Sequence, residues 1–290
     1  MNLKKLKQQK SIQELLEFGI INFDKPADWT SFDVVNYVKR TLGLRKTSHF
    51  GTLDPMVTGV LPVALNRACK LTGFFIGEDK EYEGVMRIHT DISLEEIKKK
   101  IEEKFIGKIM QMPPVKSRVK RQLREREIYK FNLIKKDGKR IYFRVECEGG
   151  TYIRKLIHDL GESLGIGAHM IELRRIRAGI FLEKNCITKK EFEKAVEEFE
   201  KGNEKFLREI IIPAEIISDV YEIVEIKKDN LKKIFTGKPI HKEDLIKLKN
   251  FEKGKIISVF CEDRFIGMYK IINGKDIFAK AEFVMQPISL

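Results

Sequence analysis

Hydrophobic and polar positions follow two periods along this chain, one typical of strands and one typical of helices. Short apolar runs and alternation predict strands at 19–23, 80–88 and 141–147. Apolar residues at helical spacing predict helices that start after Ser31, run from 94 to about 104, and run from Ile153 to Leu164. Mixed strands and helices in this order indicate an α+β protein.

Capping signals set the ends of several of these helices. Thr30 or Ser31 can cap the first, and Gly43 is expected to stop it. Ser93 with Glu96 reads as a capping box, and a second box at 188–191 predicts another helix there.

The texture of the chain changes twice. Residues 1–18 are expected to be a short basic extension with a helix near 12–18. From about residue 219 onward, short strands and turns replace the longer elements. We therefore expect three parts: the extension at 1–18, a main domain at 19–212 and a small domain at 213–290.

Composition points to a globular protein with a polyanionic partner. The 290 residues are 42% hydrophobic and carry a formal net charge of +13. Nucleic acid is the simplest partner for such a charge, although a merely lysine-rich chain would look the same. No apolar run has the length of a membrane span, and the N-terminus lacks the apolar core of a signal peptide. We expect no membrane partner and a cytoplasmic protein.

The cysteines and histidines do not form a metal-binding pattern. Four cysteines stand far apart and never as Cys-x-x-Cys, and five histidines are scattered. Neither a structural metal site nor a disulfide framework is indicated. We expect no metal and no cofactor.

The stretch 48–65 carries the clearest candidate for chemistry. Asp54 precedes a proline, and Gly51 and Gly59 flank it before an apolar run. The proline biases Asp54 toward an extended backbone, and the glycines allow sharp bends. From the Asp-Pro pair alone, an ordinary turn would be the better interpretation.

The whole string is more informative than the pair. His-x-Gly-Thr-Leu-Asp-Pro-x-x-x-Gly-Val-Leu-Pro, starting at His49, resembles the catalytic loop of the TruB/dyskerin family of pseudouridine synthases. The resemblance extends over about 19–287 and makes Asp54 the catalytic carboxylate. Phe50 departs from the family, where a small residue usually precedes the glycine.

The resemblance also implies a fold and further site residues. It implies a catalytic domain with a central mixed or antiparallel sheet flanked by helices, plus a small C-terminal β-barrel, the RNA-binding PUA domain. Further site residues are implied by four strings that match motifs of the family: Asn-x-Asp-Lys-Pro, Lys-Glu-Tyr, Gly-x-x-Tyr-x-Arg and Glu-Leu-Arg-Arg. The residues implied are Asp54, Arg154 and Tyr82 for catalysis, and Tyr152, Leu173, His49 and Lys25 around the substrate.

Arg154 has a physical argument of its own. It falls in the first turn of a predicted helix, where the helix dipole disfavours a cation. A cation kept there needs a partner, and Asp54 is the obvious one. Lys25, by contrast, is equally well explained as part of a plain turn, and Leu173 nearly as well as a core leucine.

Residues 116–130 form the most concentrated positive segment. They include seven basic and two acidic side chains, a net of +5. A solvated charged hairpin is the simple interpretation, while a basic arm would suit an RNA backbone. The RNA-binding candidates are Lys116, Arg118, Lys120, Arg121 and Arg124.

The resemblance implies isomerisation of uridine to pseudouridine in RNA, rRNA or tRNA. An ionised Asp54 would stabilise or trap the ribose as the glycosidic bond breaks, and the sequence leaves open whether it attacks C1′ or removes a 2′ proton. Details of the arm and the short link after Ile88 resemble the branch guided by H/ACA RNA, archaeal in type, which works with a Nop-type zinc-ribbon subunit, a Gar-type subunit and a kink-turn-binding ribosomal-type protein. The alternatives are a stand-alone enzyme for the tRNA T-loop and a non-catalytic RNA-binding protein.

Overall fold

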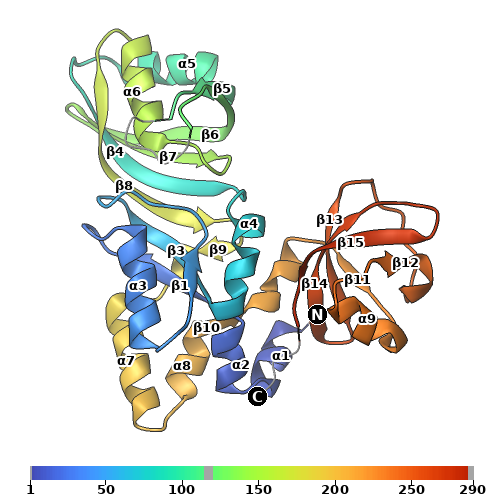
Figure 1. Ribbon diagram of the computed structural model, residues 1–290. Coiled ribbons are helices and arrows are strands. Elements are labelled where there is room, and N and C mark those ends of the chain that lie inside the picture. The colour runs from blue at the N-terminus through green and yellow to red at the C-terminus, as the bar shows by residue number, and fades with distance from the viewer. Residues whose placement is uncertain (1, 114–119, 287–290) are drawn as a thin grey trace.

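The structure is a computed structural model that describes residues 2–113 and 120–286. Within this part of the chain, one large mixed sheet and one small sheet organise the molecule (Figure 1). The strands of the large sheet are β1 (Gly19–Lys25), β2 (Thr47–His49), β3 (Thr58–Leu65), β4 (Lys80–Ile88), β5 (Gly107–Gln111), β6 (Arg124–Asp137), β7 (Arg140–Cys147), β8 (Ala168–Ala178), β9 (Phe181–Leu182) and β10 (Ile211–Pro213).

The large sheet has the order β10-β1-β3-β8-β4-β7-β6-β5, with β2 paired to β3 and β9 to β8. Only the contact of β3 with β8 is parallel among these strand pairs. The long strands β4 and β8 run side by side through the middle of the sheet and join its two ends (Figure 1). The two ends of the large sheet are therefore connected through this central pair of strands.

Helices cover the sheet at each end. Figure 1 shows α5 and α6 at the end that contains β5–β7, and α3, α7 and α8 at the end that contains β1 and β10. Their bounds are α3 (Ser31–Thr41), α4 (Thr72–Phe75), α5 (Leu94–Lys104), α6 (Ile153–Ser163), α7 (Lys189–Glu200) and α8 (Lys205–Ile210). The fold predicted for the main domain, a mixed sheet flanked by helices, is confirmed.

The predicted caps explain where these helices begin. Thr30, rather than Ser31, caps α3, and its side chain and that of Asp33 satisfy each other's backbone N–H groups. The boxes that start at Ser93 and Thr188 cap α5 and α7 in the same way. Each box satisfies N–H groups that would otherwise lack a partner at the helix start.

The N-terminal extension contains two short helices, α1 (Leu3–Gln9) and α2 (Ile12–Glu17). The second lies where a helix was predicted, and the first adds a turn that the sequence analysis did not identify. Both pack against the body of the protein, because Lys7 Nζ donates to the Glu209 carbonyl at 2.9 Å and Lys10 pairs with Glu215. The extension is thus an ordered part of the fold.

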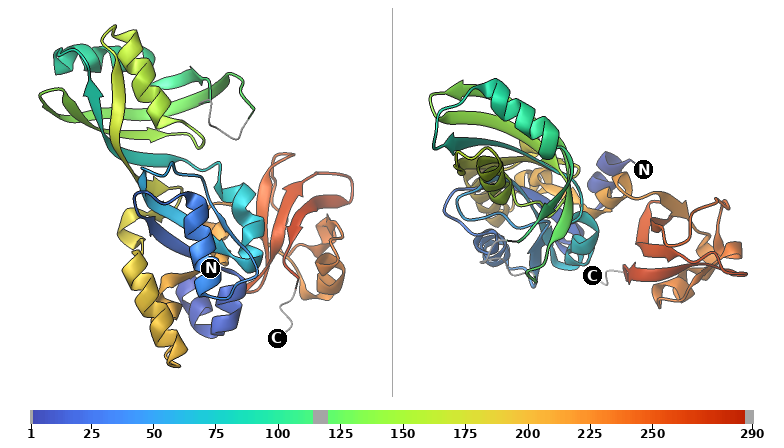
Figure 2. Two further views of the ribbon diagram at one scale, coloured as in Figure 1. Left: turned by 60° about the vertical axis from the view of Figure 1, so that its left-hand side comes forward. Right: turned by 90° about the horizontal axis from the view of Figure 1, so that it is seen from above.

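The small sheet forms the C-terminal unit, where a small β-barrel was predicted, and its five strands curl into a half-barrel. Its order is β11-β13-β14-β15-β12, and Figure 2 shows it as a curled layer beside the large sheet. The elements are β11 (Ile223–Glu225), α9 (Leu231–Phe235), β12 (Ile240–His241), β13 (Ile256–Cys261), β14 (Arg264–Ile271) and β15 (Ile277–Val284). The strand β10 crosses residue 212, where the sequence analysis placed the end of the main domain. The domain boundaries stay a prediction.

Candidate active site

The Asp54 loop (residues 50–57) joins β2 to β3 and is fixed on both sides of its carboxylate. The Ser31 hydroxyl in α3 accepts a hydrogen bond from the Leu53 N–H at 2.8 Å and donates to the Leu53 carbonyl at 3.2 Å. Val57 N–H then donates to the Asp54 carbonyl at 3.0 Å and closes a turn. The Asp54 side chain stays 43% exposed. The loop therefore holds its backbone firmly and presents one carboxylate to the outside.

Lys25 braces this loop from below. It is fully buried at the end of β1, and its ammonium donates to the carbonyls of Pro26 at 2.8 Å, Trp29 at 2.5 Å and Pro55 at 2.8 Å. Burial lowers the pKa of Lys25 to about 8. The lysine thus ties the turn after β1 to the residue that follows Asp54, which favours the bracing interpretation over a plain turn.

Phe50, the residue that departs from the family string, anchors the start of the loop. It is 1% exposed and stacks on Phe75 with ring centroids 4.6 Å apart. A third ring, Phe181, lies 5.9 Å from it. The large side chain is accommodated because α4 and β9 supply aromatic partners for it.

Arg154 and Asp54 meet as the sequence analysis predicted. Arg154 lies in the first turn of α6, and its Nη2 is 3.0 Å from Asp54 Oδ2. The Arg154 side chain is 49% exposed. An opposite charge at this distance favours the ionised carboxylate and orients it.

Tyr82 and Leu173 lie behind this ion pair on the central strands. Tyr82 in β4 is 7% exposed, and Leu173 in β8 is also 7% exposed. Both belong to the main hydrophobic core, and Leu173 pairs in register with Gly84, two residues after Tyr82. Burial raises the pKa of Tyr82, which favours the neutral phenol.

Tyr152 stands at the start of α6, two residues before Arg154. Its backbone N–H donates to Gln111 Oε1 at 3.0 Å, and Gln111 Nε2 donates to the Tyr152 carbonyl at 3.3 Å. Gln111 is 2% exposed at the end of β5. This buried amide fixes the backbone that carries both Tyr152 and Arg154.

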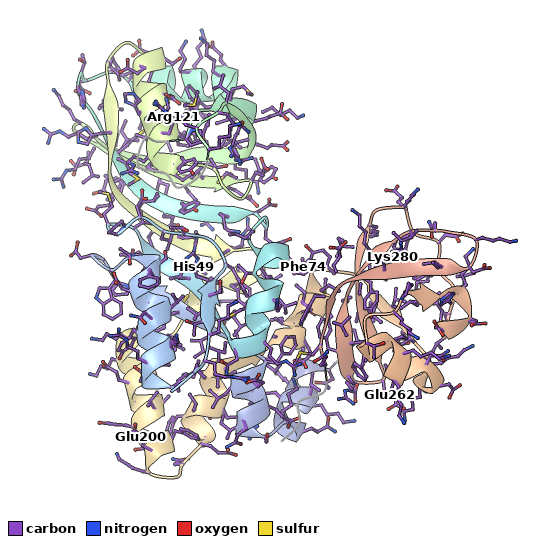
Figure 3. The ribbon with its side chains drawn as sticks, in the orientation of Figure 1. His49, Phe74, Arg121, Glu200, Glu262 and Lys280 are labelled. Atoms are coloured by element: carbon purple, nitrogen blue, oxygen red, sulfur yellow. The ribbon has the colours of Figure 1, made fainter. Side chains whose placement is uncertain are left out.

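His49 ends β2, immediately before the Asp54 loop, and lies near the middle of the molecule (Figure 3). Among the described residues, its buried Nδ1 has no hydrogen-bond partner. Burial and the nearby Arg175 lower the pKa of His49, which favours the neutral imidazole. His49 thus places a neutral ring directly before the Asp54 loop.

Two buried cations at the site were missed from the sequence. Arg175 in β8 is 1% exposed, and Lys80 at the start of β4 is 3% exposed. Lys80 Nζ donates to the Glu78 and Ile76 carbonyls, and burial lowers the pKa of Lys80 to about 8. Strand alternation could have found Arg175, because residues 173 and 175 of one strand share a face.

The predicted basic arm is only partly described. Lys116 and Arg118 lie outside the described residues, whereas Lys120 and Arg121 are exposed. Arg121 lies over the end of the sheet that carries α6, in the view of Figure 3. Arg124 begins β6, half-buried, and its Nη2 is 3.4 Å from the Lys120 carbonyl. Among the described members of the arm, no hydrogen bond or ion pair joins Lys120, Arg121 or Arg124 to the Asp54–Arg154 pair.

Two further searches cover the described residues. In residues 2–113 and 120–286, no three or more His, Cys, Asp or Glu side chains form a cluster that could hold a metal ion. No helix in the same ranges is both long and apolar enough to cross a membrane.

Comparison with known proteins agrees with the geometry. A family model for the N-terminal domain of TruB family pseudouridylate synthases matches residues 39–153, and one for the C-terminal domain of tRNA pseudouridylate synthase B matches residues 154–218. A curated relative from Methanopyrus kandleri, called "Probable tRNA pseudouridine synthase B", is 41% identical over 87% of this chain and 75% of its own length.

Solved structures extend the likeness to the whole fold. A chain of a Cbf5-Nop10-Gar1 complex is 35% identical, covers 97% of this chain and 89% of its own, and has a TM-score of 0.89. A chain from an H/ACA RNP bound to a substrate RNA that contains 2′-deoxyuridine is 33% identical over 97% of this chain and 89% of its own, with a TM-score of 0.86. The chain belongs to the TruB family of pseudouridylate synthases and is a pseudouridine synthase of the TruB/Cbf5 type.

Proposed function

We propose that this chain is the catalytic subunit of a guide-RNA particle of the H/ACA type, which converts chosen uridines of rRNA, and of tRNA, to pseudouridine. The observation that carries the proposal is its likeness, over nearly the whole chain, to a Cbf5 chain solved together with Nop10 and Gar1. We expect this reaction to take place in the cytoplasm.

In this proposal, Asp54 is the catalytic carboxylate and Arg154 is its partner. Breakage of the C1′–N1 bond develops positive charge on the ribose, which an ionised carboxylate stabilises or traps. The 3.0 Å contact with Arg154 supports the role, because it keeps the carboxylate charged and aimed. The half-exposed position of both groups supports it too, since an RNA sugar must reach them.

The remaining site residues handle the base. Tyr82 offers its ring to the detached uracil and is the candidate for moving the C5 proton. Leu173 and Tyr152 line the same space, and Lys25 holds the Asp54 loop. A uridine in a folded RNA has to be flipped out, and His49 is placed to stack in the gap that this leaves.

RNA binding is assigned to the basic arm and the C-terminal half-barrel. Lys120 and Arg121 are exposed and suit phosphate contacts, as do Arg124 and the undescribed Lys116 and Arg118. The accessory partners would be a Nop-type zinc-ribbon subunit, a Gar-type subunit and a kink-turn-binding ribosomal-type protein. The names Nop10 and Gar1 support the first two, and the third rests on the sequence resemblance.

A stand-alone enzyme for the tRNA T-loop is the second candidate, and the name of the curated relative favours it. The non-catalytic alternative is set aside, because the chain belongs to an enzyme family and brings Asp54 and Arg154 together.

The decisive test is reconstitution with two guide RNAs that differ only in their pairing pockets. We expect each guide, with the accessory proteins, to direct pseudouridine to its own target uridine, and the Asp54→Asn variant to leave both targets unmodified. If both guides gave the same site, or the bare protein modified a tRNA T-loop equally fast without any guide, the tRNA enzyme would replace this proposal.

A further inference from the structure

Arg175 joins the start of the Asp54 loop to β3, the strand that follows the loop, with a single side chain. Its Nε donates to the Val60 carbonyl at 2.7 Å and its Nη2 to the Gly51 carbonyl at 3.0 Å. Gly51 comes before Asp54 and Val60 comes after it. The planar guanidinium therefore spans the base of the loop and fixes how far apart its ends lie.

Two glycines, Gly51 in the loop and Gly59 at the start of β3, lie close to the same residue. Gly51 has φ +113°, and a Cβ there would lie 3.4 Å from Arg175 Nη1. Gly59 has φ +101°, and a Cβ there would lie 2.3 Å from the Arg175 carbonyl oxygen. Gly51 thus approaches the side chain of Arg175 and Gly59 approaches its backbone, both in conformations that favour glycine.

Arg175 also lies beside the strand of Tyr82. The two residues pair in register between β4 and β8, while Gly59 of β3 pairs with Arg175 from the other side. Arg175 is therefore the point where the strand of the proposed base-handling tyrosine meets the loop of the proposed carboxylate.

The charge of Arg175 is costly where it is. Within the described ranges, no carboxylate forms an ion pair with this fully buried guanidinium, which instead donates to the carbonyls of Gly51 and Val60. A buried cation with neutral partners costs free energy that an apolar side chain of similar volume would not. Burial lowers the pKa of Lys80 and of His49, and the charge of Arg175 adds to both shifts. Burial raises the pKa of Tyr82, and the charge of Arg175 together with a hydrogen bond opposes that rise.

We propose that Arg175 is a positioning residue for the isomerisation, which sets the separation of Asp54 from Tyr82 and supplies a fixed positive charge behind the pocket. The inference rests on the roles proposed above for these two residues. Because a displacement of about 1 Å at a reacting group can cost about 100-fold in rate, loss of this link should slow chemistry rather than weaken RNA binding.

The test compares Arg175→Met and Arg175→Lys in the full reconstituted particle, by single-turnover conversion at saturating RNA. We expect Arg175→Met to react about 100-fold more slowly with an unchanged Kd for RNA, since the two carbonyls lose their hydrogen-bond donor and the positive charge is removed. Arg175→Lys keeps the charge but cannot span both carbonyls, so we expect a loss of about tenfold.

Arg208→Met is the matched control. Arg208 Nη1 also donates to two backbone carbonyls, of Lys7 at 3.0 Å and Lys10 at 2.7 Å, but it does so at the N-terminal helices. We expect this variant to lose thermal stability and keep its single-turnover rate. Arg175→Met or Arg175→Lys that is folded at the assay temperature and reacts within about twofold of wild type would overturn the inference. Asp54→Asn, run beside them, tests the loop assignment separately, because it should be inactive whatever Arg175 does.

Discussion

At the scale of single residues, the Asp54–Arg154 pair is better explained by chemistry than by stability. Both side chains are more than two-fifths exposed, at 43% and 49%, and exposed ion pairs contribute only about 0–1 kcal/mol. The pair also places a cation at the start of α6, where the helix dipole disfavours it. A residue pair with so little effect on folding, held in a fixed geometry beside a braced loop, is expected to act on substrate.

Asp54→Asn should abolish turnover and leave RNA binding intact. The amide keeps the shape of the carboxylate but cannot neutralise positive charge at C1′, so we expect a loss of at least ~10⁴-fold, roughly 5 kcal/mol of barrier. Pseudouridine formation by the purified variant, measured together with its Kd for RNA, checks this. Multiple turnover by a folded Asn variant would contradict the role of Asp54.

Arg154→Ala should reduce the rate of pseudouridine formation to near zero, because Asp54 loses the contact that orients it. Arg154→Lys should recover only part of the rate, since an ammonium cannot reproduce the geometry of a guanidinium. Rates for both variants under single-turnover conditions separate charge from geometry. Full activity of the Lys variant would show that a point charge is enough.

At the scale of elements, the sequence predicted what depends on neighbours along the chain. Capping boxes fixed the starts of α5 and α7, because their hydrogen bonds join residues three apart. Family strings placed Asp54, Arg154 and Tyr82, and their roles stay predictions. The roles of Arg175 and Lys80 were missed because their partners are backbone carbonyls, and a backbone acceptor leaves no trace in the amino-acid sequence. The carbonyls that Arg175 binds lie in distant segments, whereas those that Lys80 binds lie just before it in the chain.

Lys25, which joins β1 to the Asp54 loop, gives a prediction on pH. Its pKa in the folded protein is about 8, whereas a lysine in an unfolded chain titrates near ~10.4. Below pH ~8 both states hold the proton, and the cost of burying the ammonium is fully present. Between pH ~8 and ~10 the unfolded chain binds the proton that the folded protein has lost, so the free energy of unfolding rises with pH.

The measurement is the difference in free energy of unfolding between wild type and Lys25→Met, from denaturant titrations at several pH values. This difference isolates Lys25 from Lys80, which titrates in the same range. We expect it to increase in favour of wild type from pH ~8 to ~10. A difference that stays flat over this range and falls only above pH ~10 would mean that the pKa of Lys25 is raised, because the three carbonyl contacts hold the ammonium more strongly than burial disfavours it.

At the scale of the whole molecule, one hydrophobic cluster connects the catalytic loop to the C-terminal half-barrel. It contains Phe50 of the Asp54 loop, Val60 of β3, Phe18 of the N-terminal extension, and Phe260 and Phe265 of the half-barrel. The domain prediction treated these parts as separate along the chain, because sequence texture says nothing about which units share a core. The half-barrel, to which we assign RNA binding, is thus held at a set position relative to Asp54.

Phe18 is the link to test, since it lies between the two units. It is 1% exposed and stacks on Phe265 with centroids 5.5 Å apart and planes at 19°. Phe18→Ala should cost about 3–5 kcal/mol of unfolding free energy. A double-mutant cycle with Phe265→Ala should show a coupling of about 0.5–1.5 kcal/mol beyond the loss of buried area.

The functional consequence separates docking from simple stability. If the half-barrel anchors RNA for the distant active site, Phe18→Ala should slow modification in the guided particle while the RNA still binds. Phe192→Ala is the matched control, because Phe192 is also fully buried but lies on the buried face of α7, in the main core and away from the half-barrel. We expect the control to lose a similar free energy of unfolding and to keep its rate below its melting temperature. Equal slowing by both variants would show that the rate follows stability alone and that docking of the half-barrel has no separate part in catalysis.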